Sequence, residues 1–481
     1  MYTQFSIVKG AGKARIITAP DERLKLLQRK LALLLDQLYR VRNPVHGFVK
    51  NRSVKSNAES HSKRRYVVNI DLSDFFPSIT ENRVRGLLRA LGLDIRVSDI
   101  IARISCFEGH LPQGAPTSPV ISNMICYRLD TALLKFAKNT RSIYTRYADD
   151  ITFSTFQPPT ALFSGGVPAS GRFAPEILAT ELINAIKSNG FVINAEKSHY
   201  ADKHARRIVT GLKINELINV DRRFVRNLRA AIHSIEQTGL VIAQAKFDAK
   251  FGSGKSLKSH LAGKVSWLAF IKGQTDPLVR SIVLRFNRCF PDSTLKVEMT
   301  ESEKLYRSVW VVEHEGELGT QGTCFFLQDV GLVTAAHCVQ NIDNVEIYHP
   351  SKPSNKFGAK VVRRHEHRDL ALLEPTLPET EYFSLLCAES IVGVEAPTTA
   401  LGYPGYGPGD KLNIRSGTVS SLPTKQGVQY IEVTQKIGPG MSGGPLVDSS
   451  QHVIGINHKG GPEMARDYAV SIVELKAWLL E

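Results

Sequence analysis

The chain has little of what builds disulfide scaffolds and membrane spans. It contains six cysteines in 481 residues, with no Cys-x-x-Cys pair and no dense cysteine spacing, so a disulfide-stapled secreted domain is not expected. No apolar run approaches the roughly 20 residues of a membrane-spanning helix. The first residues lead directly into charged sequence rather than into a signal peptide. We therefore predict a soluble protein of the reducing cytoplasm with no membrane partner.

Positive charge is concentrated in the first part of the chain. Residues 1–300 hold 46 Lys and Arg against 24 Asp and Glu, a net charge of +22, whereas residues 301–481 hold 15 against 22, a net charge of −7. A basic part of this size predicts salt-sensitive binding to a polyanion such as nucleic acid. The remainder has the charge of an ordinary acidic globular part, and the length leaves room for two or three domains.

Two carboxylates occupy the turn of a predicted β-hairpin. Residues 143–153 alternate around Asp149 and Asp150, and a second predicted strand, 67–70, leads directly into Asp71. Three carboxylates at strand ends supply the hard oxygen ligands that two Mg²⁺ ions need for phosphoryl transfer. The pattern therefore predicts polymerase chemistry, with these three aspartates as catalytic residues and metal ligands.

Residues 1–290 resemble reverse transcriptases, because several segments follow in the order typical of that family. The segments are Lys13–Ile17, Asp71–Ile79, Leu111–Pro119, the Asp149-Asp150 hairpin and Asn194–Lys197. The resemblance implies an α+β right-hand polymerase with fingers, palm and thumb and with two Mg²⁺ ions. It also implies a nucleotide site. Phe76 would exclude a ribose 2′-OH and so favour dNTPs, Gln113 and Gly114 would shape the site, and Arg15 is either a triphosphate contact or a surface residue.

Two short motifs narrow the resemblance to retron reverse transcriptases. Residues 57–61 match an Asn-Ala-x-x-His signature, and residues 209–212 match a Val-Thr-Gly signature. The resemblance implies that these motifs contact nucleic acid through Asn57, His61, Val209, Thr210 and Gly211. An ordinary polar helix face is the alternative for the first motif. The partner implied is a folded non-coding RNA, which the enzyme primes from a 2′-OH and copies into a branched RNA–DNA molecule.

A basic helix is predicted over residues 221–238, with Gly239 as its stop. One face carries the apolar residues Phe224, Leu228, Ile232 and Ile235, and another carries Arg222, Arg226 and Arg229. Such an arginine row can follow a phosphate backbone, although a solvated helix face is the plainer alternative. Upstream, the Pro-, Gly- and Ser-rich segment 157–175 is predicted to be an inserted surface loop.

Residues 305–481 show short apolar runs between Gly and Pro turns, which predicts an all-β barrel fold. Three short segments carry candidate catalytic residues: Thr334–Cys338 with His337, Asp369–Leu373 with Asp369, and Gly438–Leu446 with Ser442. The order His, Asp, Ser is that of chymotrypsin-like serine proteases, which this part resembles. The resemblance implies an all-β double-barrel domain.

Serine chemistry explains these residue types. A neutral serine is a poor nucleophile, so His337 would take the Ser442 proton as a general base. Asp369 would hold the imidazole tautomer and stabilise the imidazolium. Gly440 leaves room for backbone N–H groups to turn inward, so the N–H groups of Gly440 and Ser442 would form the oxyanion hole.

The predicted specificity pocket departs from that of trypsin. Lys436 stands six residues before the nucleophile, where trypsin-type specificity needs Asp, so cleavage after Arg or Lys is disfavoured. Residues 455–461 resemble the pocket wall of glutamyl endopeptidases. The hypothesis is a preference for an acidic side chain, with charge from Lys436 or His458, and a solvent-facing His458 is the alternative. Cys324 and Cys338 are expected to be free buried thiols.

These resemblances imply a retron-like RNA-directed DNA polymerase fused to a serine endopeptidase whose protein substrate is unknown. We expect fingers and palm at 1–220, a helical thumb at 221–290, a linker at 291–304 and the protease at 305–481. By analogy with retron systems, the protease would be a toxic effector in anti-phage defence. Two alternatives stay open: a group II-like or other defence reverse transcriptase, and a protease fold that serves only as a binding or assembly module.

Overall fold

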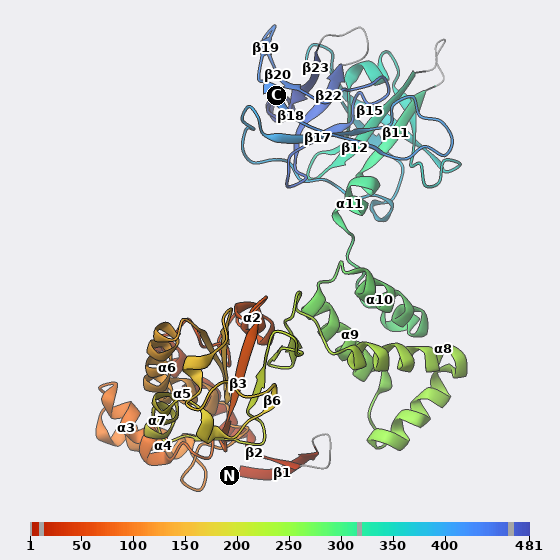
Figure 1. Ribbon diagram of the computed structural model, residues 1–481. Coiled ribbons are helices and arrows are strands. Elements are labelled where there is room, and N and C mark those ends of the chain that lie inside the picture. The colour runs from red at the N-terminus through yellow and green to blue at the C-terminus, as the bar shows by residue number, and fades with distance from the viewer. Residues whose placement is uncertain (1, 9–13, 315–319, 460–465) are drawn as a thin grey trace. The chain divides into compact units, whose positions relative to one another are not determined.

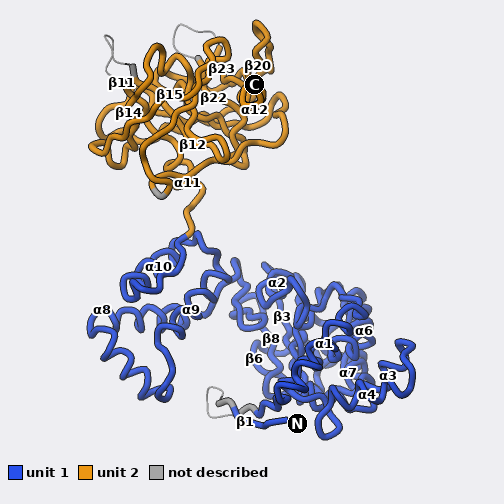
Figure 2. The backbone as a smooth tube through the Cα atoms, turned by 180° about the vertical axis from the view of Figure 1, so that it is seen from behind, with its two compact units in different colours: residues 1–297 blue, residues 298–481 orange. Residues whose placement is uncertain are grey.

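The computed structural model describes residues 2–8, 14–314, 320–459 and 466–481. The chain divides into two compact units, Met1–Val297 and Glu298–Glu481 (Figure 2). The segment expected to be a linker, 291–304, contains this division and also the first residues of helix α11 (Glu301–Ser308). Among the described helices, none combines the length and the apolar character that crossing a bilayer requires.

An antiparallel sheet forms the centre of the first unit. Its strands run in the order β4 (Ile143–Tyr147), β5 (Asp150–Thr155), β3 (Tyr66–Ser73), β8 (His199–Ala201) and β6 (Gly171–Arg172), and β7 (Val192–Ile193) pairs with the end of β3. Strand β3 is apolar and largely buried because strands flank it on both sides. Figure 1 shows α5, α6 and α7 gathered beside the sheet.

Helices and two small hairpins surround the sheet. The helices are α1 (Glu22–Leu38), α2 (Val54–Ser60), α3 (Glu81–Ala90), α4 (Ile95–Ser105), α5 (Ser118–Ile125), α6 (Tyr127–Asn139) and α7 (Thr180–Ser188). The hairpins pair β1 (Tyr2–Val8) with β2 (Ala14–Pro20), and β9 (Ile208–Val209) with β10 (Leu212–Lys213). Helix and sheet together form the α+β architecture that the sequence predicts.

The segment 157–175 is not the plain surface loop that its composition suggests. It contributes strand β6 to the sheet and buries three apolar side chains, Leu162, Phe163 and Phe173. The rings of Phe163 and Phe173 meet edge to face with centroids 5.7 Å apart. Its Gly and Pro residues therefore separate short structured pieces, and the prediction of a loop was wrong for its apolar positions.

Three helices complete the first unit: α8 (Arg222–Phe251), α9 (Leu257–Lys272) and α10 (Pro277–Cys289). Asp221 caps α8, and Leu228, Ile232 and Ile235 lie in the core that the three helices share. Gly239 breaks the helix with φ 78° and ψ 164°, but helical structure resumes at once. The predicted stop is therefore a kink.

The second unit consists of two six-stranded barrels, which confirms the predicted double-barrel fold. The first barrel closes in the order β11 (Val309–His314), β12 (Thr320–Leu327), β13 (Gly331–Thr334), β16 (Leu370–Pro375), β15 (Lys356–His365) and β14 (Asn344–Tyr348). The second contains β18 (Asn413–Ser421), β17 (Pro397–Gly402), β21 (Pro445–Val447), β22 (Val453–Lys459), β23 (Asp467–Ser471) and β20 (Val428–Val433). Pairing of β18 with β20 closes this second barrel. The short strand β19 (Thr424–Lys425) pairs with the start of β20, and α12 (Ile472–Leu480) follows β23.

Candidate active sites

Three carboxylates converge at one end of the central sheet. Asp71 on β3 lies directly opposite Asp150, the first residue of β5, and the Asp149 carbonyl accepts a hydrogen bond from the Leu72 N–H at 3.1 Å. Asp71 is buried, whereas Asp150 is exposed. The donor set is made only of hard oxygen ligands, so these residues fit a pair of Mg²⁺ ions.

A lysine already brings positive charge to this site. The Lys197 ammonium donates to both carboxylate oxygens of Asp71, at 2.8 and 2.9 Å. Burial lowers the pKa of Lys197, but this hydrogen bond and the charges of Asp71, Asp149 and Asp150 outweigh burial and raise it. In the sequence, Lys197 is recognisable only as part of the motif Asn194–Lys197, which by itself predicts no role for it. Its contact shows that the carboxylate cluster attracts a cation.

A buried ion pair supports the hairpin from beneath. The Arg146 guanidinium donates to both oxygens of Asp130 at 2.8 Å, and neither side chain is exposed. The same guanidinium lies 3.2 Å from the Ala148 carbonyl and 3.2 Å from the Asn123 Oδ1. Ala148 has a φ of 56°, a left-handed conformation that costs a non-glycine residue energy. Arg146 thus holds the strained turn that presents the two aspartates.

The predicted nucleotide-site residues lie on two neighbouring segments. The Gln113 carbonyl accepts from the Thr18 N–H on β2 at 2.9 Å. Gly114 has a φ of 131°, and a Cβ there would lie 2.9 Å from the Thr18 oxygen, so only glycine allows this approach. Arg15 lies on the same strand, β2. The half-buried ring of Phe76 contacts Phe75, with ring centroids 5.3 Å apart. Their roles toward a nucleotide stay predictions.

The two retron signatures meet in space, but their key side chains are buried. Asn57 on α2 reaches the Thr210 hydroxyl at 3.5 Å, and that hydroxyl donates to the Val54 carbonyl at 3.2 Å. The His61 ring nitrogens bond Ser154 at 2.6 Å and Thr145 at 2.7 Å, on β5 and β4.

Burial decides what these signature residues can contact. Asn57, His61 and Val209 have no exposed surface, so the expectation that they touch nucleic acid directly needs correction. They fasten α2 and the β9–β10 turn to the catalytic sheet. Thr210 is half-buried and Gly211 is exposed at that turn, and both have positive φ. These two remain available as contacts.

The three thumb arginines line a hollow. Arg222, Arg226 and Arg229 are exposed on α8 and border a hollow of about 340 Å³, together with apolar side chains that include Val225 and Leu278. Guanidinium groups spaced along one face suit phosphate oxygens. The arrangement matches the predicted row.

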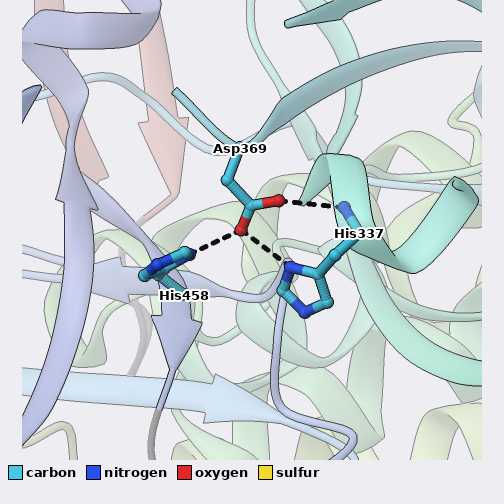
Figure 3. Close-up of side chains that lie close together, drawn as sticks. All are labelled: His337, Asp369 and His458. Carbon is cyan, nitrogen blue, oxygen red and sulfur yellow. Dashed lines mark hydrogen bonds and ion pairs between the residues drawn. The ribbon is translucent and has the colours of Figure 1, made fainter. Parts of the chain in front are cut away.

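The residues predicted to form a serine protease site come from both barrels of the second unit. His337 lies in the short helix η5 (Ala336–Val339), Asp369 precedes β16, and Ser442 precedes β21. Asp369 Oδ1 accepts from the His337 backbone N–H at 2.9 Å, and Asp369 Oδ2 lies 2.7 Å from His337 Nδ1 (Figure 3). The Ser442 hydroxyl is directed to the His458 carbonyl at 3.1 Å. His337 and Asp369 are therefore paired, whereas Ser442 donates its hydrogen bond to the His458 carbonyl.

Charge stabilises the pair that His337 and Asp369 form. Burial lowers the pKa of His337, but the hydrogen bond with Asp369 and the neighbouring Cys338 raise it to about 10. Burial raises the pKa of Asp369, but hydrogen bonds from His337 and His458 outweigh it and hold it well below its usual range. The Ser442 hydroxyl is directed to the His458 carbonyl, so proton transfer to His337 would require that hydroxyl to turn.

The predicted oxyanion hole lies in the glycine-rich turn before β21. Gly440 has a φ of 89°, and a Cβ there would lie 2.6 Å from the Tyr403 oxygen. The Pro439 carbonyl, which shares a peptide with the Gly440 N–H, accepts from the Gly405 N–H at 3.1 Å, and this bond fixes the orientation of that peptide. Among the residues that the structure describes, none accepts from the backbone N–H of Gly440 or Ser442. The role of these donors stays a prediction.

The pocket hypothesis assigned His458 and Lys436 to an acidic substrate side chain, but both have partners within the chain. His458 Nδ1 lies 2.5 Å from Asp369 Oδ2, and the Lys436 ammonium lies 3.0 Å from the buried Asp467 carboxylate. His458 neither faces solvent freely nor stands apart from the catalytic residues. Cys324 and Cys338 are free and buried, as predicted.

Two family models match the chain. The model described as reverse transcriptase (RNA-dependent DNA polymerase) matches residues 7–214, and the model described as trypsin-like peptidase domain matches residues 322–456. The chain joins a reverse transcriptase domain to a trypsin-like serine protease domain. The reverse transcriptase domain implies a divalent-metal-dependent polymerase.

The reverse transcriptase domain is similar to those of retrons. It is 36% identical over 268 residues to the Retron Mx162 reverse transcriptase of Myxococcus xanthus, covering 48% of this chain and 52% of that protein. It is 37% identical over 225 residues to the Retron Ec86 reverse transcriptase of Escherichia coli, covering 46% of this chain and 66% of that protein. The chain thus spans between about half and two thirds of the length of these relatives.

Among solved structures, the second unit is similar to the active form of the Rv3671c protease from M. tuberculosis. The match covers 37% of this chain and 82% of that protease chain, at 22% identity and a TM-score of 0.33.

Proposed function

We propose that the chain binds a folded non-coding RNA in the bacterial cytoplasm, primes from a 2′-OH within it and copies part of it into RNA-linked single-stranded DNA. The observation that carries this proposal is the convergence of Asp71, Asp149 and Asp150 in a domain similar to retron reverse transcriptases. The buried contact of Asn57 with Thr210 adds support, because it joins two retron signatures that lie 153 residues apart.

Within this proposal Asp71, Asp149 and Asp150 would hold two Mg²⁺ ions, whose charge would favour phosphoryl transfer from a nucleoside triphosphate. The remaining work falls to side chains of the chain. Lys197 keeps positive charge beside Asp71 and so reduces the repulsion among the carboxylates. The Phe76 ring limits the space beside the sugar, which favours dNTPs. Gln113 and Gly114 shape the base-pair site against β2.

RNA and the RNA–DNA product are expected to lie along the basic face of the first unit. Arg222, Arg226 and Arg229 would contact phosphates, since they are exposed and border a shared hollow. Recognition of a folded RNA depends on its shape and loops as much as on its charge, so Thr210 and Gly211 at the exposed turn are candidate contacts.

We propose further that the second unit is a serine endopeptidase and the effector of a defence system against phage. His337 would take the Ser442 proton as the hydroxyl attacks a peptide carbonyl, and Asp369 would stabilise the resulting imidazolium. The Gly440 and Ser442 N–H groups would stabilise the oxyanion. Proton transfer requires Ser442 to leave the His458 carbonyl and to reach His337. Fusion to a retron-like polymerase supports control by the nucleic acid.

One purification tests the polymerase half. The chain is purified from cells that carry its native flanking DNA, beside an Asp149→Ala/Asp150→Ala variant and a Ser442→Ala variant, and the bound nucleic acid is sequenced. We expect a discrete RNA-linked DNA with the unmodified chain and with Ser442→Ala, and RNA alone with the aspartate variant. Heterogeneous DNA, or RNA without DNA in every sample, would favour another class of defence reverse transcriptase.

A further inference from the structure

One carboxylate oxygen of the protease site serves two imidazoles. Asp369 Oδ2 lies 2.7 Å from His337 Nδ1 and 2.5 Å from His458 Nδ1 (Figure 3). Both distances are hydrogen-bond distances, and a carboxylate oxygen only accepts, so each imidazole donates through Nδ1. His337 and His458 lie on opposite sides of the oxygen, with ring centroids 6.1 Å apart.

His458 also reaches the third member of the site. Its backbone carbonyl accepts from the Ser442 hydroxyl at 3.1 Å. The residue lies on β22 of the second barrel, whereas Asp369 and His337 belong to the first. Its ring packs against Tyr430 of β20, with centroids 5.4 Å apart, and its side chain is 15% exposed. A ring held in this way has little freedom to leave Asp369.

We propose that His458 is a positioning residue of the protease site, whose Nδ1–H fixes the Asp369 carboxylate and tempers the strength with which that carboxylate binds His337. The proposal rests on the proposed roles of His337, Asp369 and Ser442. The oxygen shares its negative charge between two donors, so its attraction for either one is weaker than it would be for a lone partner.

The sign of the effect on His337 does not depend on the charge of His458. A neutral Nδ1–H and an imidazolium both withdraw negative charge from Asp369, and both therefore disfavour the imidazolium form of His337. The titratable groups that face His458 among the described residues are Asp369, His337 and Tyr430. Removal of the donor is expected to make His337 more basic, so less of it is free to accept a proton at a given pH.

The test compares a variant that keeps the donor with one that removes it. His458→Asn retains an N–H near the position of Nδ1, whereas His458→Leu fills similar space without a donor. The rate of labelling of the full chain by a fluorophosphonate is measured against pH, since this reagent reports activation of Ser442 without knowledge of the substrate. We expect a rate within about twofold of the unmodified chain for Asn. For Leu we expect about a tenfold loss, which corresponds to about one pH unit on the rising limb of the profile.

Polymerase activity of each variant serves as the control for folding, because that site lies in the other unit. Proton NMR gives a readout that needs no protease activity: the unmodified chain should show two strongly downfield imidazole N–H resonances, and His458→Leu should show one. Equal labelling profiles for all three proteins, or unchanged resonances in the Leu variant, would overturn the inference. A chain that shows both resonances but is never labelled contradicts the proposed peptidase function and leaves the shared carboxylate standing.

Discussion

Arg146 and Asp130 form a bidentate ion pair that is completely buried beneath the hairpin that carries Asp149 and Asp150. Breaking such a pair leaves one charge without compensation in the interior. We expect Arg146→Met to lower the free energy of unfolding of the first unit by about 3–5 kcal/mol, and to abolish DNA synthesis because the Ala148 turn loses its support. Urea unfolding and a primer-extension assay measure the two effects. Lys25→Met, at the exposed pair with Glu22, is the matched control and should cost less than about 1 kcal/mol.

Lys197 and Mg²⁺ should compete for Asp71. The ammonium contacts both oxygens of that carboxylate. Because the Lys197 side chain is exposed, we expect the pair to be worth up to about 1 kcal/mol. Lys197→Met should therefore tighten Mg²⁺ binding by up to about fivefold, measured by calorimetry on the free protein. The variant Lys203→Met, exposed nearby in sequence, should leave the affinity unchanged. Weaker binding in Lys197→Met would contradict competition.

The thumb arginines should set the salt dependence of nucleic-acid binding. Each phosphate contact contributes about 0.7–0.9 to the slope of log K against log salt. Replacing Arg222, Arg226 and Arg229 by Ala should lower that slope by about 2–3, in fluorescence-anisotropy titrations with an RNA–DNA duplex. Loss of Arg96 and Arg103, which are exposed on α4, provides a comparison of like charge. Equal slopes for both sets would mean that α8 does not follow the backbone of the duplex.

The buried histidines of the first unit should make it sensitive to acid. Burial, together with nearby positive charge, lowers the pKa of His46 to about 4 and that of His61 to about 3. The unfolded chain binds protons at the ordinary value of about 6.5, so the unfolded state takes up more protons and stability falls as pH drops below that value. We expect a loss approaching 1.4 kcal/mol per pH unit for each histidine, seen in urea unfolding between about pH 7 and 5. His61→Leu should remove one of the two contributions. An unfolding free energy independent of pH would show that neither ring is neutral in the fold.

The ionised pair of His337 and Asp369 should stabilise the protease unit only within a limited range of pH. The raised pKa of His337, about 10, stabilises the fold below the unfolded value near 6.5, and this contribution is lost as pH rises through about 10. The lowered pKa of Asp369 contributes above its unfolded value near 3.9 and is lost as pH falls. Asp369→Asn should therefore reduce thermal stability most between these limits, and Glu389→Gln, at an exposed position, should not. A constant difference from acid to alkaline pH would contradict this linkage.

Sequence patterns indicated both candidate sites because each stands out locally. Asp149 and Asp150 interrupt an alternating apolar stretch, and Ser442 lies among glycines. Close contact with a backbone or a metal leaves a signature of that kind within a few residues. The fold class of the first part was implied by its resemblance to reverse transcriptases, whereas short apolar runs between turns predicted the all-β character of residues 305–481.

The errors concern partners that lie far apart in the chain. His61 was predicted to contact nucleic acid because of its place in the retron-like motif at residues 57–61. Its two ring nitrogens instead bond Thr145 and Ser154, which lie 84 and 93 residues away in the chain. His458 was predicted to lie in the specificity pocket because residues 455–461 resemble the pocket wall of glutamyl endopeptidases. Its partner Asp369 lies on the other barrel. Burial of a polar side chain depends on tertiary pairing, which local pattern does not encode.

The protease site is built across the seam between its two barrels. His337 and Asp369 come from one side, and Ser442 and His458 from the other. Strand pairing holds each barrel internally, whereas the bond from His458 to Asp369 crosses the seam. A slight slip of one barrel along the other would thus misalign the site before any strand separates. The predicted catalytic residues therefore come together only where the two barrels are correctly aligned.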